Sequence, residues 1–66
     1  MSTVVDSLAA AASRLDDVAE SARYAASVLD GVSDGLVDRA MDLVRRADDV
    51  RVSVVRARDA LDQAGL

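Results

Sequence analysis

The chain contains no cysteine, histidine, lysine, proline, phenylalanine, tryptophan, isoleucine or asparagine. Without cysteine it cannot form a disulfide, and without cysteine or histidine it lacks the usual ligands of structural zinc. Without histidine the chain lacks the commonest general base, and without cysteine it lacks a thiol nucleophile. Without lysine it lacks the amine that forms Schiff bases. Seven serines are present, but a serine nucleophile needs a neighbouring base. We therefore expect a protein that is not an enzyme and binds no cofactor.

Acidic side chains are the only numerous metal ligands left in the sequence. Asp16 with Glu20, and Asp38 with Asp42, form pairs at helical spacing that suit a hard cation. Metal sites inside helical bundles use carboxylates that point into the core, and the core positions expected here are apolar. We interpret the acidic pairs as solvated helix surface and expect no metal site.

The chain is also short and its apolar residues are small. It has 66 residues, with 13 Ala, 11 Val and 7 Leu and a single Tyr. A domain of this size buries only about 60% of its unfolded surface, and alanine adds little buried area. Since neither a disulfide nor a metal site is expected, oligomerisation is the remaining support. We expect a chain that is not a lone monomer.

The charge is acidic overall, with a net charge of −4, all eight cations being Arg and eleven of the twelve acids Asp. This usage is typical of GC-rich coding, as in an actinobacterium, one of its phages or a halophile. The net charge argues against a nucleic-acid surface. No basic leader and no apolar stretch of the roughly 20 residues needed to span a membrane is present. We expect a soluble cytoplasmic protein without membrane contact, export without a cleavable signal being the alternative.

A heptad pattern of apolar residues runs through the chain and changes phase once. Steps of four and three residues recur on both sides of the segment 30–35, which holds two of the three glycines. The pattern predicts two coiled-coil helices, at about 3–30 and 35–63, joined by a turn at 31–34. Gly31 fits a left-handed helix end, and Ser33 or Asp34 fits the next N-cap. We expect the first helix to start at Ser2 or Thr3. The two helices together form a single domain, 1–66. The expected seam of this antiparallel hairpin is Leu8, Leu15, Val18, Leu29, Leu36, Leu43, Val50, Val54 and Leu61.

Each helix has a second apolar stripe beside the expected seam. A hairpin of two helices has only one mutual seam, so a second stripe requires another protein surface. The simplest solution is a twofold homodimer that forms a four-helix bundle, and another helical protein is the alternative. The residues expected to bind the partner are Val5, Ala12, Ala19, Ala26, Val37, Met41, Val44, Val52 and Val55.

Arginine is concentrated in the second half of the chain. The candidate anion-binding residues are Arg45, Arg46, Arg51, Arg56 and Arg58. Nucleic-acid binding by this cluster is one hypothesis. Pairing with acidic residues of the first helix is the hypothesis we favour, because no aromatic residues are interleaved for base stacking.

Three families resemble the chain in part. A turn at Asp30-Gly31 in a chain of this length resembles the Rop-type RNA-binding hairpin, a dimeric four-helix bundle, although here the first helix is acidic. Leu29-Asp30-Gly31 is similar to the L-x-G signature of type VII secretion substrates, which are helical hairpins. Asp49, Ser53 and Arg56 resemble the start of the motif in anti-sigma hairpins that bind cyclic di-GMP, but Ala60 and Ala64 replace its later polar residues.

These observations together predict an all-α hairpin that acts through helix–helix docking. We expect a non-catalytic interaction module, working as an adaptor, regulator or assembly element. Its partner is a second copy, another helical protein, or both, and no small-molecule substrate is expected. The alternatives are a small Rop-like regulator that binds nucleic acid through its Arg-rich second helix and a hairpin associated with type VII secretion.

Overall fold

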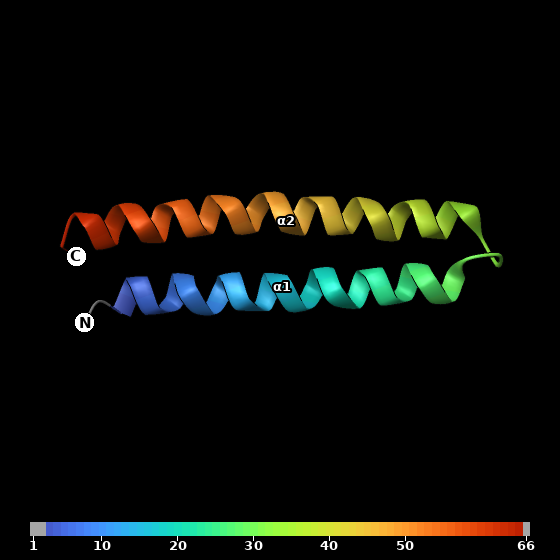
Figure 1. Ribbon diagram of the computed structural model, residues 1–66, viewed down its shortest axis with the longest axis horizontal. Coiled ribbons are helices and arrows are strands. Elements are labelled where there is room, and N and C mark those ends of the chain that lie inside the picture. Colours follow the sequence, from blue (N-terminus) through green and yellow to red (C-terminus); the bar gives the residue numbers. More distant parts are fainter. Residues whose placement is uncertain (1–2, 66) are drawn as a thin grey trace.

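The computed structural model describes residues 3–65 and shows two helices packed side by side in opposite directions (Figure 1). Helix α1 spans Thr3–Leu29 and helix α2 spans Asp34–Gln63. Every regular element in this range is an α-helix, which confirms the all-α class with two helices. The helix ends at the turn differ from the expected ones by one residue on each side. Residues 1, 2 and 66, which complete the expected domain 1–66 and include the alternative start at Ser2, lie outside the described residues.

Local sequence explains the two long helices. Alanine favours the α-helix more than any other residue type, and the chain has four consecutive alanines at 9–12 and many later ones. No proline interrupts either helix. Within residues 3–65, neither helix has an apolar stretch long enough to cross a membrane.

The turn is built by a glycine and a serine cap. Gly31 has φ of +80°, the left-handed conformation expected for the residue after a helix end. The amides of Val32 and Ser33 both donate to the Leu29 carbonyl, at 2.9 and 3.1 Å. The Ser33 hydroxyl accepts a hydrogen bond from the Leu36 amide at 3.3 Å and caps α2. The chain therefore reverses direction within four residues.

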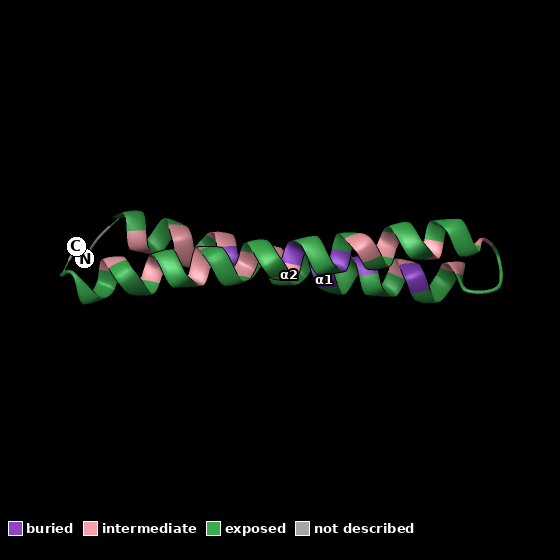
Figure 2. Cartoon of the chain, turned by 90° about the horizontal axis from the view of Figure 1, so that it is seen from above, coloured by how far each residue is buried: buried purple, intermediate pink, exposed green. Residues whose placement is uncertain are grey.

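The buried core is made of small side chains between the two helices. Among the described residues, those that are buried are Ala12, Ala19, Ala22, Ala26, Val44 and Ala47. Ala19 and Ala22 of α1 pack with Val44 and Ala47 of α2, and Leu15 lies against this cluster. Buried segments occupy the middle of the hairpin and the part toward the turn (Figure 2). Alanine allows the helices to approach closely.

The seam lies one position around each helix from the expected one. Ala12, Ala19 and Ala26 were expected on an outer face, but they are buried inside the hairpin, as is Val44. In the single hairpin these four residues are therefore not exposed to a partner. Conversely, the expected seam residues Val18, Leu36, Leu43 and Val50 are 42–49% exposed. The remaining expected seam residues, which are half-buried, are Leu8, Leu15, Leu29, Val54 and Leu61.

The difference has a simple geometric cause. Helix α1 carries three neighbouring apolar rows, whereas α2 carries two apolar rows beside a third that contains Val44 but also Arg51 and Arg58. In each helix the middle row belongs to both alternatives for the seam. In α1 the middle row contains Leu8, Leu15 and Leu29, and the structure completes it with the alanine row of Ala12, Ala19 and Ala26. In α1 the small alanines allow the helices to approach closely, and the larger Val4 and Val18 are left outside.

Candidate interaction surface

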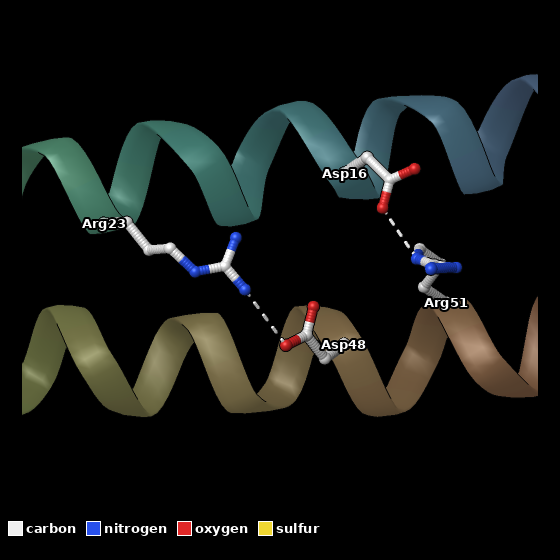
Figure 3. Close-up of polar contacts among 4 residues, drawn as sticks. All are labelled: Asp16, Arg23, Asp48 and Arg51. Atoms are coloured by element: carbon white, nitrogen blue, oxygen red, sulfur yellow. Dashed lines mark hydrogen bonds and ion pairs between the residues drawn. The ribbon is translucent and has the colours of Figure 1, made fainter.

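One flank of the seam is joined by two ion pairs between the helices (Figure 3). The Arg51 Nε lies 2.6 Å from Asp16 Oδ1, and the Arg23 Nη2 lies 3.4 Å from Asp48 Oδ2. All four side chains keep at least 40% of their exposure. These residues define the charged flank of the hairpin.

The opposite flank is apolar on both helices. In α1, Val18 and Ala25 come two positions after the ion-pairing residues Asp16 and Arg23. In α2, Val50 comes two positions after the ion-pairing Asp48. Two positions correspond to about 200° around an α-helix, so these residues lie on the other side of the seam. Because the ion pairs place the charged rows of both helices on one flank, the apolar rows share the other flank. We call this surface the apolar face; its residues are Val4, Ala11, Val18, Ala25, Leu36, Leu43, Val50 and Ala57.

The apolar face is accessible in the single chain. Leu36, Leu43 and Val50 are 46, 48 and 49% exposed, and Val18 is 42% exposed. Burying such side chains would contribute about 25 cal/mol of stabilising free energy for each Å² of apolar surface removed from water. The eight residues recur every seven positions in each helix, so an uncharged strip follows the length of the hairpin. A strip of this kind on a small protein is typical of a docking surface.

The other residues expected to bind a partner are spread around the hairpin. Val5, Val37 and Val55 are half-buried, while Met41 and Val52 are 42 and 44% exposed. Met41 and Val55 belong to the same row as Asp48, seven residues away on either side, and thus lie on the charged flank. Val52 lies two positions beyond Val50, away from the apolar face. The structure does not bring these five residues together on one surface.

The candidate anion-binding arginines are largely engaged with acidic side chains. Arg45 and Arg46 both lie near Asp42, at 3.7 and 3.0 Å. Arg51 pairs with Asp16 as described, and the Arg58 side chain lies 3.0 Å from Asp59. Arg56 is exposed and has no ion pair with another described residue. The five arginines thus do not form one free cationic patch, and nucleic-acid binding stays a prediction.

The acidic pairs and the single aromatic residue lie on the outer surface. Asp16, Glu20 and Asp38 are exposed, and Asp42 is half-buried beside the two arginines. Among residues 3–65, no three acidic side chains gather closely enough to hold a metal ion. Tyr24 is 73% exposed. None of these residues extends the apolar face.

The sequence contains a signal for the apolar face that the expected surfaces did not use as a unit. Val4, Ala11, Val18 and Ala25 are spaced by seven, as are Leu36, Leu43, Val50 and Ala57. The larger residues of these rows, Val18, Leu36, Leu43 and Val50, were assigned to the hairpin seam, since leucine and valine at heptad spacing predict the most buried position. The exposed fractions of Leu36, Leu43 and Val50, together with the ion pairs on the opposite flank, show which row lies outside.

Comparison of the chain with protein-family models, curated proteins and solved structures finds no match. The likenesses to Rop-type, secretion-associated and anti-sigma hairpins therefore stay at the level of short motifs and architecture.

Proposed function

We propose that this chain is a non-catalytic protein–protein interaction module that works by docking its apolar face onto other helices, most simply as a homodimeric four-helix bundle. The observation that carries the proposal is the uncovered row of Leu36, Leu43 and Val50 beside Val18 of the neighbouring helix. Such residues belong in the core of a bundle rather than in water. An adaptor, regulator or assembly element needs no chemistry beyond this contact.

The arrangement of the charged flank supports docking through the opposite side of the hairpin, the apolar face. Its ion pairs already join α1 to α2, so that flank is satisfied within the hairpin. The apolar face has no corresponding partner among the described residues. An interaction module of this design presents one specific surface and leaves the rest of the hairpin soluble.

The test compares two valines of α2 that point in different directions. Val50 lies on the apolar face and is 49% exposed, whereas Val52 lies away from it and is 44% exposed. A tagged chain is used to capture an untagged copy and proteins from a lysate of the native host. Val50→Arg should abolish the capture of every specific partner, because a charge in a desolvated interface costs several kcal/mol. Val52→Arg should leave capture unchanged. Equal behaviour of the two variants would reject the apolar face as the docking surface.

A further inference from the structure

The apolar face is strongest at the end of the hairpin that holds the turn. Val28 and Val32 are 58 and 76% exposed at this end, and Leu36 of the apolar face is 46% exposed. Val32 belongs to the turn, three residues after the end of α1. Toward the chain ends the rows of the apolar face supply alanines, and Val4 is the only larger side chain among their described residues. The uncovered hydrophobic area is therefore concentrated in the turn half of the molecule.

The amount of exposed surface matches one additional helical layer. A compact monomer of 6.9 kDa is expected to expose about 4,000 Å², whereas the hairpin exposes 4831 Å². The excess, about 800 Å², is close to the area that each partner loses in a standard specific interface. The broad side of the hairpin measures 50 by 14 Å between Cα atoms, so one partner of equal length covers it.

From these observations we infer that a second copy of the chain covers the apolar face, with both turns at the same end and the twofold axis parallel to the helices. The inference rests on the proposed function and specifies its partner and geometry. A second copy has the required length and the same heptad spacing. Placing both turns together lays the two turn halves, which are the most apolar parts, against each other.

The sizes of the side chains favour the same arrangement. The row on α1 is small, with alternating valine and alanine, and the row on α2 is larger, with Leu36 and Leu43. With the turns together, α1 of each copy lies on α2 of the other, so that a small row always meets a larger one. With the turns at opposite ends, α1 would lie on α1 and α2 on α2. That alternative crowds one side of the bundle and leaves gaps on the other, and both defects reduce stability.

Distance measurement between spin labels tests the arrangement directly. Since the chain has no cysteine, Asp30→Cys places a single label at the turn, and Gln63→Cys places one at the opposite end. In the full-length dimer, both labels should show distances of about 10–25 Å, because neighbouring helices pack about 8–10 Å apart. Sedimentation equilibrium on the same samples gives the oligomeric state.

The possible outcomes separate this inference from the proposed function. Two long distances near the 50 Å length of the hairpin would establish opposite turns and overturn the inference. A short distance at one label and a long one at the other would indicate a staggered dimer and overturn it too. A monomer throughout would also overturn it. In all three cases the proposed function stands if capture of a partner remains sensitive to Val50→Arg and insensitive to Val52→Arg.

Discussion

The half of the hairpin that holds the turn, residues 17–48, and the open half, residues 3–16 and 49–65, have the same fold but are held together differently. In the turn half, Ala22 and Ala26 are buried between the helices together with Val44. In the open half, α2 continues the row of Val44 with Arg51 and Arg58, and among the residues described there only Ala12 is buried. The turn half is stabilised by close packing of small side chains, whereas the open half is closed by half-buried apolar residues and by one partly exposed ion pair, Arg51 with Asp16.

This difference implies a gradient of local stability along one pair of helices. Packing of small apolar side chains excludes water and is insensitive to salt. Exposed ion pairs contribute about 0–1 kcal/mol each and are screened by salt. The open half should therefore separate before the turn half, and the seam arginines mark the boundary.

The largest effect is expected from a charge placed in the packed half. Val44 is 5% exposed and Val52 on the same helix is 44% exposed. Val44→Asp should lower the free energy of unfolding by about 3 kcal/mol or more, because it leaves an unpaired charge in the core. Val52→Asp should change it by less than about 0.5 kcal/mol. Urea denaturation followed by circular dichroism measures both values. A small effect of Val44→Asp would mean that the turn half is not the packed half.

A second prediction concerns the turn that closes the packed half. Gly31 has a positive φ of +80°, whereas Gly35 is helical, and a Cβ at either position meets open space. Gly31→Ala should cost about 1–2 kcal/mol, since only the backbone conformation is unfavourable. Gly35→Ala should stabilise the protein by about 0.5 kcal/mol. Thermal unfolding of the two variants provides the comparison. Similar shifts for both would show that the left-handed conformation carries no cost here.

Sequence reasoning predicted the helices and the turn because those features depend on local signals. Gly31 was identified from residue type and position alone, and Ser33 was one of the two residues proposed as the N-cap. The seam differs from the predicted one for two reasons. In α1 three adjacent apolar rows satisfy the heptad pattern equally well, and in α2 the structure uses the row of Val44 and Arg51 in place of the more apolar row of Leu43 and Val50. The choice depends on how closely the helices approach and on which acids meet Arg23 and Arg51, and both are properties of the pair of helices. The same ambiguity placed Ala19 on the partner surface, whereas it is the least exposed of the buried residues.

The seam arginines provide a way to make the two halves alike. Arg51 occupies a seam position and its side chain is 40% exposed, while Arg46 lies outside the seam with 78% exposure. Each makes one ion pair with an aspartate. Arg51→Leu should stabilise the open half by about 1 kcal/mol, since replacing a partly buried ion pair with an apolar side chain is often favourable. Hydrogen exchange of the amides in 51–63 should become slower in that variant. Arg46→Leu should leave those amides unchanged, and faster exchange in Arg51→Leu would show that the ion pair is what holds the open half.

The smallest expected effects distinguish the two ion pairs that cross the seam. Asp16 and Arg51 are joined at 2.6 Å, whereas Arg23 and Asp48 are 3.4 Å apart. Double-mutant cycles with alanine should give coupling energies below about 1 kcal/mol for both pairs, with the larger value for Asp16 and Arg51. Both couplings should approach zero near 1 M salt, where the screening length is about 3 Å. A coupling that persists at high salt would mean that the pair is shielded from solvent. If the coupling of Asp16 with Arg51 persisted in this way, the open half would be closed by more than exposed charges, and its stability would approach that of the turn half.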